Sequence, residues 1–272
     1  MARTVKVVAT AAFLLLLTFS GCRSRDALLS QAQSAWDQED WKTAVAKYEE
    51  FLKDTPPPDQ AAEVHFKAGN VYYLNLKQFD RAAEHYIRLI EDFPKFREAE
   101  LVYQRLAECY TQSKKIREAI SEYENLIKAF PDSPNRRKIR LQIADLYYDN
   151  DKSQSLMEYQ KVLRDAPYDD LTEKAYLRIG GIRFIRNEYE QAVPAYQAVA
   201  DKSKDPSIKR DARDHLSYCL ESSGNYDQAV KILEETQPDP SRPDYLAGRI
   251  KGIRERQKTR KLIQPESLGD GR

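Results

Sequence analysis

The sequence has little of the residues that form tight turns, disulfides and catalytic centres. Of its 272 residues, nine are glycine, three are cysteine and three are histidine. Scarce glycine argues against a fold with many tight turns and suits helices. His65, His85 and His215 are isolated in the sequence, with no HExxH zinc motif, no neighbouring cysteine nucleophile and no glycine-rich phosphate loop. We therefore expect no catalytic residue, no metal, no cofactor and no enzyme activity.

The chain also lacks an excess of charge of either sign. It contains 44 basic and 43 acidic residues, and charged residues make up 32% of the sequence. Near neutrality argues against a whole-protein field that would attract nucleic acid, so no nucleic-acid partner is expected. Abundant charge of both signs is typical of helices with solvated faces.

The longest apolar run is too short to cross a membrane. It extends over 13 uncharged residues from Val7 to Phe19, against about 20 for a spanning helix. Arg3 and Lys6 precede it and small residues follow it, as in a secretory signal. We expect residues 1–21 to be a signal peptide that is cleaved before Cys22.

The segment Phe19-Ser20-Gly21-Cys22 resembles the lipobox of bacterial lipoproteins. The resemblance implies a diacylglycerol on the Cys22 sulfur and an acyl chain on its amine, followed by a short tether to residue 25. Several acyl chains hold a protein durably, because each buried methylene contributes about 0.8 kcal/mol. Arg23, in place of aspartate, implies the outer membrane, with the protein facing the periplasm. The alternative is a secreted protein cut nearby, with Cys22 incidental.

A spacing of four and then eight residues recurs four times along the chain. It appears as Ala44-Tyr48-Pro56, Ala82-Tyr86-Pro94, Ala119-Tyr123-Pro131 and Ser155-Tyr159-Pro167. The steps between the prolines are slightly above the period of about 34 residues of a two-helix repeat. Proline cannot donate a backbone hydrogen bond and disfavours helix at the preceding residue, so the four prolines are expected to close the second helices.

The pattern is identified as that of the tetratricopeptide repeat (TPR). The resemblance implies an all-α solenoid of about six helical hairpins over residues 26–240, a basic capping helix at 241–262 and a disordered tail at 263–272. Small residues such as Gly69, Ala82 and Gly180 should lie where helices cross closely, and tyrosines should fill the wider spaces. Cys109 and Cys219 occupy equivalent places three repeats apart, too far for a disulfide, and should be buried hydrophobic residues.

The first helices of such repeats line a concave groove. Carrying this geometry over predicts a partner-binding face formed by Trp36, Lys67, Val71, Asn75, Gln104, Glu108, Tyr148, Phe184 and Tyr218. Aromatic side chains beside amide and charged groups suit an extended peptide or a partner helix. The alternatives are that some of these residues pack between helices, or that the chain itself fills the groove.

The C-terminal segment is basic. From Tyr245 to Arg272 it contains eight basic residues against three acidic ones, with Leu246, Ile250 and Ile253 at helical spacing. We expect its apolar face to close the last repeat and its basic face to lie in solvent. The alternative is that the basic face meets an anionic partner, such as lipid headgroups or an acidic protein surface.

A lipobox followed directly by repeats that end in Phe93-Pro94 and Phe130-Pro131 resembles the BamD-like TPR lipoproteins of β-barrel assembly. The repeats are also similar to those of the Tol-Pal-associated periplasmic protein and of lipoprotein pilotins. The resemblance implies a non-catalytic, membrane-anchored scaffold whose partners are envelope proteins, with β-barrel assembly subunits first among them. The alternative is a periplasmic factor that binds peptide or glycan in cell-wall, Tol-Pal or pilus-secretin biogenesis.

Overall fold

The structure is a computed structural model that describes residues 25–263. The predicted signal peptide, the predicted lipidation site Cys22 and the tail from residue 264 lie outside the described residues. The described part is helical and contains no strand. The chain divides into two compact units, Met1–Ser133 and Pro134–Arg272, and each is described by itself.

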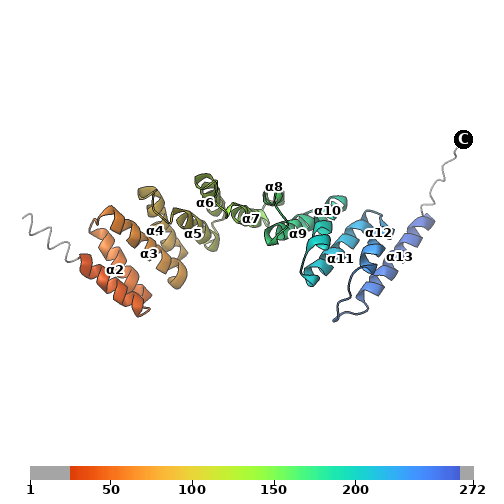
Figure 1. Ribbon diagram of the computed structural model, residues 1–272, viewed down its shortest axis with the longest axis horizontal. Helices are drawn as coiled ribbons and strands as arrows, with labels where there is room; N and C mark the ends of the chain where they lie inside the picture. Colours follow the sequence, from red (N-terminus) through yellow and green to blue (C-terminus); the bar gives the residue numbers. More distant parts are fainter. Residues whose placement is uncertain (1–24, 264–272) are drawn as a thin grey trace, which may run out of the picture. The chain divides into compact units, whose positions relative to one another are not determined.

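The first unit is built from three helical hairpins (Figure 1). Residues 25–37 are helical and pair with α2 (Trp41–Lys53). Helix α3 (Pro58–Asn70) continues directly into the π-helix η1 (Val71–Leu76) and pairs with α4 (Phe79–Asp92). The third hairpin is formed by α5 (Ala99–Gln112) and α6 (Ile116–Ala129).

The second unit contains three more hairpins and a final helix. The hairpins are α7 (Arg136–Tyr147) with α8 (Lys152–Leu163), α9 (Asp170–Ile185) with α10 (Tyr189–Lys202), and α11 (Pro206–Ser222) with α12 (Tyr226–Glu234). Helix α13 (Tyr245–Ile263) packs against α12 and buries Leu246 and Ile253. The predicted all-α fold, with six helical hairpins followed by a capping helix, is confirmed in the described part of the chain.

A single left-handed residue makes the turn in five of the six hairpins. These residues are Glu39 (φ 56°), Lys77 (φ 53°), Lys114 (φ 59°), Asn187 (φ 58°) and Gly224 (φ 82°). Each lies two positions before the first residue of the following helix. Since L-residues reach this region at a cost, the four non-glycine residues place local strain at equivalent turns, and Gly224 adopts the same turn without that cost.

The second helix of each of the first five hairpins buries one tyrosine against the first helix. Tyr48, Tyr86, Tyr123, Tyr159 and Tyr196 are all at most 3% exposed. A Cβ atom added at Gly69 would lie 2.8 Å from the Tyr86 ring, and one added at Gly180 would lie 2.8 Å from the Tyr196 ring. The expected close contacts at these glycines are therefore present. In the fourth hairpin, Ser155 replaces the buried alanine and donates a hydrogen bond from Oγ to the Ala144 carbonyl at 2.8 Å.

The remaining expectations about packing concern the prolines and cysteines. Helices α2, α4, α6 and α8 end shortly before Pro56, Pro94, Pro131 and Pro167, as predicted. Cys109 and Cys219 are free and fully buried, one in each unit. No helix among residues 25–263 is long and apolar enough to cross a membrane.

Candidate interaction site

The first unit leaves most of its predicted groove residues accessible, with one exception. Asn75 is exposed, and the side chains of four others are half-buried, namely Trp36, Lys67, Gln104 and Glu108. Val71 is completely buried and belongs to the same apolar cluster as Tyr86. It begins η1, where the helical period departs from the 3.6 residues on which the prediction rested. Val71 is therefore a core residue and not part of a binding face.

Glu108 is already satisfied inside the first unit. It accepts a hydrogen bond from the Tyr73 hydroxyl at 2.7 Å and another from Gln104 Nε2 at 2.9 Å. Burial, followed by the neighbouring Glu108 carboxylate, raises the pKa of Tyr73. Because both oxygens of Glu108 have partners, this residue links two neighbouring repeats and does not offer a free carboxylate to a binding partner.

The second unit has a hollow on the face formed by its first helices. The cavity has a volume of about 430 Å³ and is lined by Tyr148, which follows α7, by Lys174, Leu177, Arg178 and Gly181 of α9, by Tyr196 of α10, and by Ile208, Asp211 and His215 of α11. We call it the Gly181 hollow. Of the residues predicted from the sequence for this unit, Tyr148 lines it directly.

Two adjacent glycines of α9 have opposite environments. Gly180 faces the Tyr196 ring, whereas a Cβ atom added at Gly181 would meet nothing within 4 Å. The missing side chain at Gly181 therefore leaves the helix backbone accessible at the hollow. Gly180 was predicted to allow close helix packing, whereas no role was predicted for Gly181, although a second glycine inside a helix was the signal that could have found it.

A row of aromatic rings continues from the hollow along the same face. The His215 ring stacks on Tyr196 with centroids 5.1 Å apart, and Phe184 contacts His215 at 6.0 Å and Tyr218 at 6.5 Å. Tyr218 is 38% exposed, one of the few large apolar side chains with this much contact to solvent. The structure thus joins Phe184 and Tyr218 to the hollow through His215, a residue that the sequence analysis did not place in the site.

Charged groups surround the aromatic walls. Arg178 lies 4.7 Å and Lys152 5.0 Å from the centre of the Tyr148 ring, which is within the range of a cation–π interaction. Lys174 and Arg178 share one carboxylate, Asp145, at 2.7 and 3.9 Å. The hollow therefore combines flat apolar walls with cations that are held in place but only partly neutralised.

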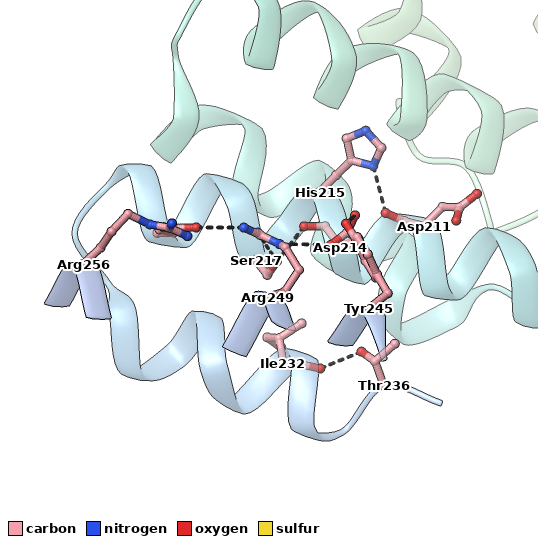
Figure 2. A network of polar contacts seen from close by, with 10 residues as sticks. Asp211, Asp214, His215, Ser217, Ile232, Thr236, Tyr245, Arg249 and Arg256 are labelled. Atoms are coloured by element: carbon pink, nitrogen blue, oxygen red, sulfur yellow. Dashed lines mark hydrogen bonds and ion pairs between the residues drawn. The ribbon is translucent and has the colours of Figure 1, made fainter. Parts of the chain in front are cut away.

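His215 has a defined proton arrangement. Its Nδ1 lies 2.8 Å from the Asp211 carbonyl oxygen (Figure 2). Since a carbonyl oxygen can only accept, Nδ1 is the donor in this contact, and the tautomer with a proton on Nδ1 has Nε2 as an acceptor. The hollow consequently offers hydrogen-bond donors from Lys174 and Arg178 and an acceptor from His215.

The first-helix face ends at a partly buried arginine of α13. The Arg249 side chain is 11% exposed and pairs with Asp214 at 3.8 Å (Figure 2) and with Glu221 at 3.2 Å. Its guanidinium lies 3.5 Å from the centre of the Tyr218 ring. The Tyr245 hydroxyl donates to Asp214 at 2.7 Å. These contacts fix Tyr218 at the end of the aromatic row.

The prediction of a basic α13 face in solvent was wrong for Arg249, whose side chain is 11% exposed, whereas Arg254 and Arg256 are exposed and still form ion pairs. Arg249 and Arg256 both pair with Glu221, and Arg254 pairs with Glu234 at 2.7 Å. The physical reason is that the last repeat presents carboxylates toward the capping helix, which sequence order alone did not reveal. The exposed cations of α13 that form no ion pair in the described part of the chain include Lys251, Lys258 and Lys261.

The structure also corrects the prediction of isolated histidines in the first unit. His65 of α3 and His85 of α4 bring their Nδ1 atoms to 3.0 Å, so one ring donates to the other. His85 Nε2 lies 3.9 Å from Glu49. Within residues 25–263, no group of three or more His, Cys, Asp or Glu side chains is placed to hold a metal ion.

Hairpins that bury a tyrosine of the second helix against small residues of the first define a TPR protein. In agreement, the chain is similar to a TPR protein from Parabacteroides merdae, with a TM-score of 0.50 and 14% identity over 89% of this chain and 90% of that one. It is also similar to the C-terminal part of a TPR protein from Cytophaga hutchinsonii, with a TM-score of 0.52 and 14% identity over 76% of both chains. These similarities establish the fold.

Within this class, residues 22–147 match the YfiO family, described as outer membrane lipoprotein. The resemblance to BamD-like TPR lipoproteins is therefore supported over nearly half of the chain. No curated protein matches the sequence. The match begins at Cys22 and ends at the last residue of α7, so Tyr148 and the rest of the Gly181 hollow lie beyond it.

Proposed function

We propose that the protein is a non-catalytic scaffold, anchored to the outer membrane through lipid on Cys22 and facing the periplasm. The match to an outer membrane lipoprotein family from residue 22 onward supports the anchor, together with the lipobox. The TPR fold supports a role in protein–protein contact. Because the chain resembles the BamD-like lipoproteins, outer-membrane protein assembly is the first process in which to test this role.

The observation that carries the binding role is the Gly181 hollow. A partner side chain can lie on the α9 backbone at Gly181, between the rings of Tyr148 and Tyr196 and beside His215. Phe184 and Tyr218 extend this surface along a partner segment. Concave, aromatic sites with a few fixed polar groups are the usual places where a partner residue is anchored.

A photo-crosslinking residue in the hollow tests this proposal. Benzoylphenylalanine would replace Lys174, which lines the hollow, and, as a control, Lys251, which is exposed on α13. The native lipidated protein would be irradiated in intact cells and the adducts identified by mass spectrometry. An adduct specific to position 174 is expected, and equal labelling from both positions would contradict a binding role for the hollow.

A pair of glycine variants provides the second control. Gly181→Leu should fill the hollow and remove the adduct, while Gly248→Leu should not, although Gly248 also has no neighbour within 4 Å of an added Cβ atom. Recovery of β-barrel assembly subunits in the adduct would support a role in outer-membrane protein assembly. Cys22→Ala should abolish labelling by an acyl tracer and release the protein from the membrane.

The second candidate is direct binding of peptide or glycan by the same hollow. The observation that favours it is the pair of tyrosine rings in its walls, because aromatic faces also bind apolar faces of small ligands. Saturable binding of a peptidoglycan fragment by the purified protein, lost in Gly181→Leu, would support this function. Recovery of Tol-Pal or pilus components as adducts would assign the scaffold to those systems instead.

A further inference from the structure

A second hollow of the Pro134–Arg272 unit has a markedly cationic lining. It lies at the start of α11, has a volume of about 340 Å³, and is lined by Ser203, Lys204, Pro206, Lys209, Arg210, Arg213, Glu235, Thr236 and Gln237. Four of these side chains are cations and one is a carboxylate. We call it the α11 basic hollow.

The cations of this hollow differ from those of the capping helix in having few partners. Arg213 donates from Nη1 to the Glu235 carbonyl at 2.6 Å, and so satisfies a group at the C-terminal end of α12. Arg210 Nε is buried without a hydrogen-bond partner. Lys204, Lys209 and Arg210 form no ion pair with any residue of the described part of the chain, whereas the α13 arginines at positions 249, 254 and 256 do.

The carboxylates near the hollow are engaged by their own turns. Asp205 caps α11 and accepts from the Ser207 amide at 2.7 Å and from the Ile208 amide at 3.2 Å. Asp239 accepts from the Ser241 amide at 3.0 Å and pairs with Arg242 at 3.2 Å. The carboxylates around the hollow are therefore Asp205, Glu235 and Asp239. The cations, with Arg242 included, still outnumber them. Since Asp205 occupies the first amides of α11, the side chains and not the helix end supply the positive field.

We propose that the α11 basic hollow binds a phosphate-class oxyanion. Guanidinium and ammonium groups are the donors that recognise phosphate, and Lys204, Lys209 and Arg210 line the hollow without an ion pair in the described part of the chain. A volume of 340 Å³ accommodates roughly ten water-sized groups, about twice the number of atoms in a phosphate ion. The site therefore takes phosphate with a substituent, either as a free phosphate ester or as a phospholipid headgroup.

Calorimetric titration with glycerol 3-phosphate at fixed ionic strength tests the proposal. The protein would be the chain from residue 22 onward with Cys22→Ala, so that no lipid contributes. Saturable binding is expected, and Lys209→Gln with Arg210→Gln should weaken it at least tenfold. The control, Lys251→Gln with Lys258→Gln, removes the same charge from exposed positions of α13 and should leave binding unchanged. If the first pair of substitutions alters the circular dichroism spectrum, the exposed Lys204→Gln serves as a second variant.

A second experiment with lipid vesicles distinguishes a phospholipid headgroup from a free phosphate ester as the source of phosphate. Vesicles of phosphatidylglycerol and phosphatidylethanolamine would be compared with vesicles of phosphatidylcholine by co-sedimentation. Retention on the former that is lost in Lys209→Gln with Arg210→Gln assigns the site to a headgroup, and titration with glycerol 3-phosphate alone assigns it to a free ester. Absence of saturable binding, or equal weakening by the α13 control, would overturn the proposal. Neither outcome depends on the Gly181 hollow, so the proposed scaffold function stands or falls separately.

Discussion

Gly180 and Tyr196 are so close that a single added carbon atom would not fit between them. The carbon would lie 2.8 Å from the Tyr196 ring, which is itself 3% exposed and cannot move outward without opening the core. The next residue, Gly181, has no atom within 4 Å of the same added carbon. Two consecutive glycines of one helix therefore serve opposite purposes, close packing and an open surface.

We expect alanine at these two positions to change stability in opposite directions. Gly180→Ala should lower the free energy of unfolding by about 1–3 kcal/mol through overpacking against Tyr196. Gly181→Ala should raise it by up to about 1 kcal/mol, because alanine is the better helix former and nothing obstructs its methyl group. Urea denaturation followed by circular dichroism measures both. Equal effects would show that the contact with Tyr196 is not tight.

The second prediction concerns the ion pairs of the capping helix. Arg249→Met should lower the free energy of unfolding of the C-terminal unit by about 1–3 kcal/mol, because it removes the cation that Glu221 and Asp214 share, although Arg256 still pairs with Glu221 and the Tyr245 hydroxyl still donates to Asp214. Arg254→Gln should change it by less than about 1 kcal/mol, because both members of its pair with Glu234 are about half exposed. Hydrogen exchange in α12 and α13 resolves the two effects, and similar protection in both variants would contradict the burial of Arg249.

The third prediction is an acid-sensitive first unit. Burial, followed by the positive charge of His65, lowers the pKa of His85 from 6.5 to about 4, and burial also lowers the pKa of His65. A base whose pKa is lower in the folded state binds fewer protons when folded. Its contribution is therefore fully present above pH 6.5 and is lost as the pH falls toward 4. For His85 this amounts to about 3 kcal/mol.

A histidine variant measures this pH dependence. In urea denaturation between pH 7 and pH 4, His85→Gln should flatten the decline of the unfolding free energy of the first unit relative to the wild type. His215→Gln, in the second unit, controls for the loss of one histidine. An unchanged slope in His85→Gln would contradict a contribution from the contact between His65 and His85.

The fourth prediction uses the left-handed turns. Lys114 has a φ of 59°, whereas Gly224 occupies the equivalent turn of the sixth hairpin with a φ of 82°. Lys114→Gly should raise the free energy of unfolding by up to about 1 kcal/mol, because glycine adopts this conformation without steric cost. Thermal unfolding provides the measurement, with the exposed helical Lys128→Gly as the control that should destabilise by a similar amount. Destabilisation by both would mean that the turn is not strained.

Much of the architecture follows from local sequence chemistry. The recurring alanine, tyrosine and proline positions predicted six hairpins, because small residues permit close helix crossings and proline ends helices regardless of distant neighbours. The same logic predicted the buried tyrosines, the close contact at Gly180 and the buried cysteines. Tyr148, Phe184 and Tyr218 could be placed on one face since position in the repeat determines which side of the first helix a residue occupies.

The sequence by itself therefore determined the repeat, the order of its helices and the face on which a partner is expected. Only the tertiary structure decided which positions are open and which are filled. Val71 became core, Gly181 became the floor of a hollow, His65 met His85, and the α13 arginines found Glu221 and Glu234. The physical reason is that a spacing rule describes one helix at a time, whereas burial and charge pairing depend on side chains from neighbouring helices that are distant in sequence.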